Sequence, residues 1–293
     1  MHPPAALLSI PPKVWYSCSI DDVKAWAFHT GSFAMISFDL DMTLLDHKTG
    51  KIPDSAMEAI DRLRKSGRRI VLATGRDMDN RYSRPWRDLI APDGIVHMNG
   101  TKVTAGGEII FDHRFDPELL KRILRFCDAR GYGIGMTIGN DDYYIHPEVV
   151  RANDIRHWGS CGRQFLDPWK IPELPVRTLA FIGDREQVAV MEKEFPMLRF
   201  PMFSTYTGAD VIEKGCSKAD GLIRLARAFG EDESLSDTVA FGDSMNDMEI
   251  IRAAGCGVAM GNAIPALKEA ADYVTDPIDR DGIWNACKKL GLF

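Results

Sequence analysis

Apolar residues in this chain of 293 residues form short runs that alternate with segments of helical periodicity. Residues 33–38 are a nearly continuous apolar run of strand length, which is typical of a strand buried on both faces. A capping box at Ser55-Ala56-Met57-Glu58 indicates the start of a helix and Gly67 its end, and the next apolar run covers residues 69–73. This order predicts a β-α-β unit with a right-handed crossover, and therefore a parallel sheet.

A second series of alternating elements begins near Val211. It predicts helices over residues 218–229, 245–254 and 265–271 and strands over residues 238–242 and 256–259. The residues between the two series have elements of their own. They predict a helix bracketed by Asp116-Pro117 and Gly131, a second helix over residues 185–194, and strands near residues 132–138, 142–146, 176–182 and 198–203.

We therefore expect the α/β fold class, with a doubly wound parallel-sheet core and an inserted α/β cap domain. The core covers residues 33–112 and 209–293, and the cap covers residues 113–208. Residues 1–32 hold proline pairs and scattered aromatic residues without a period, so they form an N-terminal extension. Two interpretations of it stay open: an ordered segment packed on the core, or a segment that is absent when translation starts at Met35.

Composition narrows the class of protein and its partners. With 45% hydrophobic and 27% charged residues, the chain has the make-up of an ordinary globular protein. A net charge of -6 and the lack of a Lys/Arg block argue against a nucleic-acid partner, and no apolar stretch approaches the length of a membrane span. The six cysteines form no Cys-x-x-Cys pair, and the N-terminus shows no secretory signal, so we expect a cytoplasmic protein.

Polar residues follow three of the predicted buried strands. Asp39 follows the first strand, Thr74 the second, and Asp243 the strand over residues 238–242. In open parallel sheets, ligands bind beyond the carboxyl ends of the strands. These side chains are therefore expected to meet in one crevice, although they lie far apart in the sequence.

Four acidic residues lie in the loops at these strand ends: Asp39 and Asp41 in the first, and Asp243 and Asp247 in the last. Four carboxylates in one pocket repel one another strongly, and a hard divalent cation relieves that repulsion. An all-oxygen ligand set suits Mg²⁺ better than Zn²⁺, which prefers His and Cys. We therefore expect Mg²⁺ as the cofactor.

The same residues supply what phosphoryl transfer needs, which is a nucleophile, a proton source and fixed positive charge. Asp39 can attack phosphorus and form an aspartyl phosphate, and Asp41 can protonate the departing alkoxide and then deprotonate water. Lys218 can supply the charge. Hydrogen bonds to the phosphate oxygens can come from Thr74 and from the backbone amides of Gly75 and Arg76, although a structural ion pair is an alternative role for Arg76.

Four motifs resemble those of the haloacid dehalogenase superfamily, in particular its Cof-type phosphatases with a cap between the second and third motifs. They are Asp39-Leu40-Asp41-Met42-Thr43, Leu72-Ala73-Thr74-Gly75-Arg76, Cys216-Ser217-Lys218 and Gly242-Asp243-Ser244-Met245-Asn246-Asp247. Asn99-Gly100 and Asp281-Gly282 also stand where this group commonly has them. The resemblance covers roughly residues 35–284.

The resemblance implies a ligand set for Mg²⁺: the side chains of Asp39 and Asp243 and the backbone carbonyl of Asp41, with Asp247 supporting the site from close by. It also implies that Asn246 meets the phosphate. Met42 departs from the pattern, because the family usually has glycine there.

The resemblance implies a small phosphorylated metabolite as the substrate. Sugar phosphates are the common preference of the family, and phosphorylated cofactors such as pyridoxal phosphate or flavin mononucleotide are the second choice. A phosphomutase would use the same aspartyl phosphate, and a phospho-accepting or metal-binding module without turnover would use a similar acidic site. Several polar and aromatic residues of the cap could line the substrate pocket, but they more often form the core of a small domain. They are Tyr143, Tyr144, His146, Arg151, His157 and Trp158.

Overall fold

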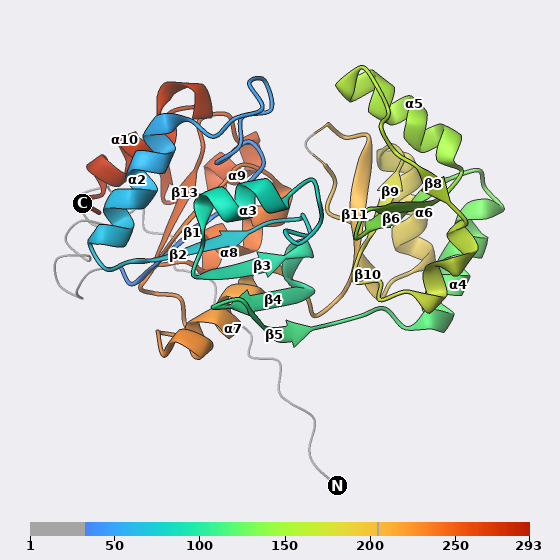
Figure 1. Cartoon of the computed structure of the whole chain (residues 1–293), viewed down its shortest axis with the longest axis horizontal. Helices are drawn as coiled ribbons and strands as arrows, with labels where there is room; N and C mark the ends of the chain where they lie inside the picture. Colours follow the sequence, from blue (N-terminus) through green and yellow to red (C-terminus); the bar gives the residue numbers. More distant parts are fainter. Residues whose placement is uncertain (1–32, 204) are drawn as a thin grey trace, which may run out of the picture.

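Two β-sheets, each covered by helices, make up the described part of the chain, residues 33–203 and 205–293, in the computed structural model (Figure 1). The predicted N-terminal extension, residues 1–32, lies outside the described residues. In the described ranges, no helix has the length and apolar character needed to cross a bilayer.

The larger sheet has eight strands in the order β14-β13-β12-β1-β2-β3-β4-β5. Six of them are parallel: β1 (Met35–Phe38), β2 (Arg69–Ala73), β3 (Gly94–His97), β12 (Thr238–Gly242), β13 (Cys256–Ala259) and β14 (Tyr273–Val274). An antiparallel edge is added by β4 (Lys102–Ala105) and β5 (Glu108–Asp112). Strand β1 lies between β12 and β2, and all four of its residues are buried, as its apolar sequence predicts.

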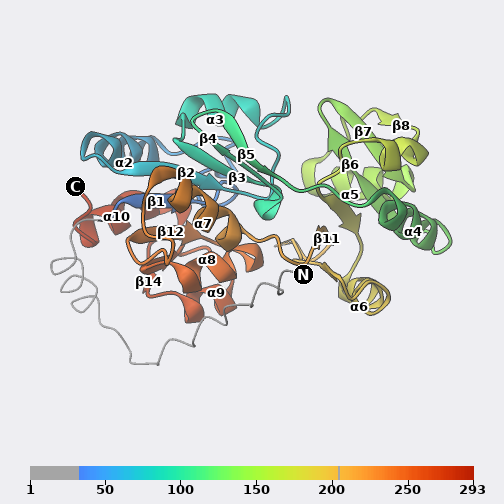
Figure 2. The same ribbon diagram turned by 90° about the horizontal axis from the view of Figure 1, so that it is seen from below.

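Helices cover both faces of this sheet. In Figure 2, α2 (Asp54–Lys65) and α3 (Arg84–Ile90) lie on one side of the strands, and the other side carries α7 (Lys218–Phe229), α8 (Met248–Ala253) and α9 (Pro265–Ala270). The last helix, α10 (Gly282–Lys289), packs against α2. The buried apolar residues of these elements form one continuous cluster, which fixes the strand ends in place.

The smaller sheet has six strands in the order β10-β11-β9-β6-β7-β8. They are β6 (Gly133–Ile138), β7 (Asp141–Ile145), β8 (Phe165–Leu166), β9 (Leu179–Ile182), β10 (Leu198–Arg199) and β11 (Gly208–Glu213). Its helices are α4 (Pro117–Asp128), α5 (Pro147–Trp158) and α6 (Arg185–Glu194). This part of the chain has a second, separate apolar cluster, and Figure 1 shows it beside the larger sheet.

The chain passes from the larger to the smaller sheet after β5 and returns between β11 and α7. An ion pair of 2.7 Å between His113 Nε2 and Glu213 Oε2 joins the two crossings. The boundary predicted at residue 208 falls at the start of β11, which pairs with β9, so the smaller sheet continues to Glu213. Arg199 of β10 also contacts Glu249 of α8, and this ion pair links the two parts.

Two local predictions were wrong. The expected capping box at Ser55 does not form, since α2 begins at Asp54 and the Ser55 hydroxyl donates to Asp281 Oδ1 at 2.6 Å instead. The helix expected over residues 245–254 is divided into a 3-10 turn over Met245–Asp247 and the short helix α8. The turn is set by the Asp247 carboxylate, which accepts the backbone N–H groups of Asp243 and Ser244, each at 3.0 Å.

Candidate active site

Three adjacent parallel strands, β12, β1 and β2, end at the same edge of the larger sheet. Asp39 follows β1, Thr74 follows β2 and Asp243 follows β12, so the predicted convergence of these residues is observed. All three are buried: Asp39 is 4% exposed, Asp243 5% and Thr74 0%. Carboxylates at such positions are costly unless a partner compensates their charge.

Carboxylate oxygens of Asp39, Asp243 and Asp247 lie within 4.8 Å of one another. Burial raises the pKa of Asp39 to about 7 even though Lys218 opposes the shift. Burial and the charges of Asp39 and Asp247 also raise the pKa of Asp243 well above its ordinary value. No donor among the described residues makes a hydrogen bond to the Asp243 side chain, so this all-oxygen cluster fits a hard divalent cation.

Lys218 is the cation that the chain itself brings to this cluster. Its Nζ donates to Asp39 Oδ1 at 2.7 Å and to Asp247 Oδ1 at 2.6 Å, and the residue is only 1% exposed. Burial alone would lower the pKa of Lys218, but the two carboxylates outweigh it and raise the pKa above its ordinary value. The lysine is therefore charged.

The start of α7 positions Lys218. Ser217 caps the helix, because its Oγ accepts the Asp220 N–H at 3.0 Å. The loop with Asn99 and Gly100 packs directly against this cap: a Cβ on Gly100, which has φ +92°, would lie 2.0 Å from the Ser217 carbonyl oxygen. Only glycine permits this close approach.

Asp41 is held by two cationic or polar groups. Arg76 donates to it through Nε at 2.8 Å and Nη2 at 2.5 Å, and His47 Nε2 lies 2.6 Å from Oδ1. Burial alone would raise the pKa of Asp41, but Arg76 and His47 bring it well below its usual range. The side chain of Arg76 thus forms the ion pair considered as an alternative, and its backbone N–H donates to Thr74 Oγ1 at 3.1 Å.

Met42, which stands where the resemblance expects glycine, has a left-handed backbone with φ 58°. This conformation costs roughly 1–2 kcal/mol for a residue with a side chain. A hydrogen bond from Asn262 Nδ2 to the Met42 carbonyl oxygen, 2.8 Å long, supports it.

A chain of amides leads from the last motif to the smaller domain. Asn246 Nδ2 donates to Asn99 Oδ1 at 2.9 Å, and Asn99 Nδ2 donates to Asp210 Oδ2 at 2.7 Å. These three side chains lie over Gly75, where a Cβ would be 3.2 Å from Asp210 Oδ2. Desolvation raises the pKa of Asp210 to about 6. Asp210 belongs to β11, and no motif in the sequence points to it.

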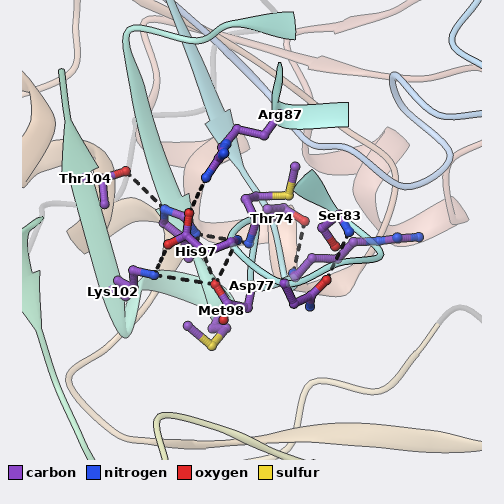
Figure 3. A network of polar contacts seen from close by, with 12 residues as sticks. Thr74, Asp77, Ser83, Arg87, His97, Met98, Lys102 and Thr104 are labelled. Carbon is purple, nitrogen blue, oxygen red and sulfur yellow. Dashed lines mark hydrogen bonds and ion pairs between the residues drawn. The ribbon is translucent and has the colours of Figure 1, made fainter. Parts of the chain in front are cut away.

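A second cluster consists of Asp77 and Asp79 from the loop that follows Thr74 and of His97 at the end of β3. Figure 3 shows Asp77 and His97 with the polar contacts around them. Lys102 contacts both carboxylates, the one of Asp77 at 3.5 Å, so the chain already supplies the cation here.

His97 in this cluster is neutral. Its Nδ1 accepts the Met78 N–H at 3.2 Å and its Nε2 lies 3.0 Å from Thr104 Oγ1, which assigns the proton to Nε2. Burial lowers the pKa of His97. The network fixes the loop that carries Gly75 and Arg76.

The polar and aromatic residues of the inserted segment mostly make contacts within the smaller domain. Tyr144 is 4% exposed and packs edge-on against Phe165, and Arg151 lies over the same ring. His146 bonds to the Asp128 carbonyl oxygen and to Glu148. These contacts favour the interpretation of these residues as part of that domain's own structure.

A cavity of about 420 Å³ opens between the two parts of the chain. Asn99, Lys218 and Asn246 line it from the larger domain, and Phe200 and Ile212 from the smaller one. Two of the predicted site residues, Lys218 and Asn246, thus border a space large enough for a small metabolite.

Comparisons with known proteins agree with this geometry. Residues 36–287 match the family model of the haloacid dehalogenase-like hydrolases. YkrA of Bacillus subtilis (strain 168), provisionally named a phosphatase, is 31% identical over 265 residues, which are 88% of this chain and 98% of YkrA. The HMP-PP phosphatase of Cronobacter sakazakii is 28% identical over 241 residues, covering 79% of this chain and 85% of that protein.

Solved structures are similar over nearly their whole length. The subclass IIB sugar phosphatase BT4131 superposes with a TM-score of 0.79 at 30% identity, covering 88% of this chain and 99% of that one. BT1666 from Bacteroides thetaiotaomicron, a phosphatase of the same superfamily, superposes with a TM-score of 0.81 at 26% identity. The match covers 90% of this chain and 97% of BT1666. These likenesses confirm the predicted fold class.

Proposed function

The chain belongs to the haloacid dehalogenase-like hydrolases and is a phosphatase of that family, and from this premise we propose that it hydrolyses phosphate monoesters of small metabolites through an aspartyl phosphate on Asp39. The observation that carries the proposal is the pairing of Asp39 with Lys218, 2.7 Å apart at the end of β1. The lysine opposes the rise in the pKa of the nucleophile that burial causes, and it lies where charge must be neutralised during transfer.

In the first step a carboxylate oxygen of Asp39 attacks phosphorus, and the bond between phosphorus and the ester oxygen breaks. The alcohol leaves with one proton. In the second step water attacks the aspartyl phosphate, inorganic phosphate departs and Asp39 returns to its carboxylate form. Thr74, the Gly75 amide and Asn246 are proposed as donors to the phosphate oxygens, since they lie around the same strand ends.

Asp41 is proposed to protonate the alcohol and then to deprotonate the attacking water. Its ion pair with Arg76 and its contact with His47 hold it as an anion, which suits the second task. For the first task the pair must open and Asp41 must take up a proton from solvent, which it then gives to the departing alcohol. A bound phosphate dianion favours the opening, because it competes with Asp41 for the guanidinium of Arg76.

Mg²⁺ is proposed as the cofactor, because the buried acidic cluster offers oxygen ligands only. Asp39, Asp243 and the backbone carbonyl of Asp41 would hold it, with Asp247 close by. When bound, it supplies positive charge for the oxygens of the transferred phosphoryl group.

The smaller domain is proposed as a cap over the pocket, with residues 33–112 and 209–293 as the catalytic core. Because β11 pairs with β9 of the smaller sheet, we propose that the cap extends to the end of β11. We also propose sugar phosphates as the substrates, a preference supported by the likeness to the sugar phosphatase BT4131, and the cytoplasm as the location.

The experiment that tests the proposal traps the intermediate. The wild-type enzyme is quenched in acid during turnover and treated with borohydride, which reduces an acyl phosphate to an alcohol. Peptide mass spectrometry should then find homoserine at position 39. Free phosphate and isomerised substrate are measured in parallel, and formation of an isomer without phosphate release would contradict a hydrolase and favour a phosphomutase.

A further inference from the structure

One carboxylate at the boundary between the two domains has no part in the proposed chemistry. Asp210 comes from β11 of the smaller domain, yet it contacts Asn99 of the larger domain and lies over Gly75. The alternation of the strand explains its direction. Ala209 and Val211 belong to the apolar cluster of the smaller domain, so Asp210 between them points to the opposite face.

The carboxylate of Asp210 is only half satisfied. Oδ2 accepts the Asn99 amide at 2.7 Å, whereas no described residue donates a hydrogen bond to Oδ1. The residue is partly exposed, so this second oxygen is open to solvent and to a ligand. Desolvation raises the pKa of this group to about 6.

The position of Asp210 restricts what can complete that pairing. Asn246 and Lys218 line the cavity, and Gly75, whose amide is proposed as a donor to the phosphate, lies next to Asp210 and Asn246. A phosphate dianion repels a carboxylate and has no proton to donate, so the phosphate itself is a poor partner. The group that meets Asp210 must carry a donor, and it must lie next to the phosphate on the side of the smaller domain. The alcohol portion of the substrate occupies that side.

We propose that Asp210 is a specificity-determining residue whose carboxylate accepts a hydrogen bond from a hydroxyl group on the alcohol that carries the phosphate. It thereby selects polyhydroxylated, sugar-like substrates over phosphate esters of alcohols without further hydroxyl groups. This inference rests on the proposed phosphatase function. A site built to bond a hydroxyl discriminates against an analogue that lacks it, because the polar groups of the site then lose that partner.

A purely structural role is the competing explanation. The bond between Asp210 and Asn99 joins the two domains, so its loss could loosen their closure. Looser closure would slow the hydrolysis of every substrate alike, whereas a lost hydroxyl contact affects only those substrates that have the hydroxyl.

The test compares Asp210→Ala and Asp210→Asn with the wild type on two kinds of substrate, in Mg²⁺ and with the full-length enzyme. Hexose 6-phosphates and ribose 5-phosphate carry hydroxyl groups near the ester, and phenyl phosphate carries none. We expect kcat/KM of Asp210→Ala to fall by about 10²-fold or more on the preferred sugar phosphate and to change by less than about 3-fold on phenyl phosphate. Glu186→Gln, an exposed carboxylate of the same domain, is the matched control and should behave as wild type on both.

Equal losses of kcat/KM on both substrates, or no loss on either, would overturn the assignment. If the variants fail to fold, a second measurement still tests the proposal. In it, the wild type is assayed on a series of deoxy analogues of its preferred sugar phosphate. We expect one analogue to lose about 10²-fold or more, and a flat series would refute the proposal. Failure of the phosphatase proposal looks different, because the wild type would then release no phosphate from either kind of substrate.

Discussion

Lys218 Nζ lies 2.7 Å from Asp39 Oδ1, and both residues are buried at the junction of β1 and α7. Lys218→Met removes the shared cation and leaves two buried carboxylates unpaired. We expect the free energy of unfolding, measured with urea in the absence of divalent cations, to fall by about 3 kcal/mol, and phosphate release to fall by roughly 10³-fold. Lys289→Met changes an exposed lysine and is the control. Unchanged stability would show that the pair is dispensable.

Asp39→Asn should abolish turnover while the fold remains intact, because an amide cannot serve as the nucleophile. We expect phosphate release to fall by roughly 10⁴-fold or more. The thermal midpoint without metal should rise or stay constant, since one buried like charge is removed. Phosphate release near the wild-type rate would exclude Asp39 as the nucleophile.

Mg²⁺ should stabilise the protein through the acidic cluster. At a concentration about 100 times its Kd it should add about 2.7 kcal/mol, seen as a higher thermal midpoint. In Asp243→Asn this shift should be much smaller. The metal-free variant should nevertheless melt no lower than the wild type, because burial and the charges of Asp39 and Asp247 raise the pKa of Asp243 and disfavour its charged form. Chelation should also stop phosphate release. An equal Mg²⁺ shift in the two proteins would place the metal elsewhere.

Asp41→Asn separates substrates by their leaving groups. An alkyl alcohol needs a proton to depart, whereas p-nitrophenolate departs without one. We therefore expect kcat/KM, which covers the steps up to departure, to fall by about 10²–10⁴-fold for an alkyl phosphate and far less for p-nitrophenyl phosphate. Equal losses would mean that Asp41 acts mainly as a structural partner of Arg76.

His97 should make stability depend on pH. Its pKa is lowered in the folded state, so the unfolded chain binds its proton first as the pH falls. The contribution of neutral His97 to the free energy of unfolding is complete above about pH 6.5, the pKa of histidine in the unfolded chain. It is lost as the pH falls below that value, by at most about 1.4 kcal/mol per pH unit. The raised pKa values of Asp39 and Asp210 act in the opposite direction over part of this range.

The comparison with His97→Gln removes that complication, because the carboxylates titrate in both proteins and cancel in the difference. When the pH is lowered from about 7 to about 5, the free energy of unfolding of His97→Gln should fall by less than that of the wild type. Parallel curves for the two proteins would count against a neutral buried His97.

The parts of the site that could be predicted rest on local signals. A buried apolar run followed by a polar residue identifies β1 with Asp39 and β12 with Asp243, and parallel strands bring their ends together wherever they lie in the sequence. The start of α7 could also be predicted, because Ser217 precedes a strongly periodic helix.

The parts that could not be predicted depend on long-range pairing. Strand β11 has a mixed sequence, and its place in the smaller sheet is fixed by antiparallel pairing with β9. Asp210 reaches Asn99 and Gly75 only because of that pairing. The partner of Arg76 likewise depends on geometry: a guanidinium near an acidic pocket suits either a phosphate or a carboxylate, and the fold brings Asp41 within 2.8 Å.

The return crossing from β11 to α7 has a mechanical consequence. Only four residues, 214–217, separate Glu213 of the smaller domain from Lys218 of the larger one, so the tether reaches no more than about 17 Å when fully extended. The first crossing is equally short, and the pair of His113 and Glu213 ties the two together. Such a double tether forbids long translations and permits rotation about a fixed pivot. Since Asp210 and Lys218 stand on either side of the return crossing, such a rotation would change the distance between them.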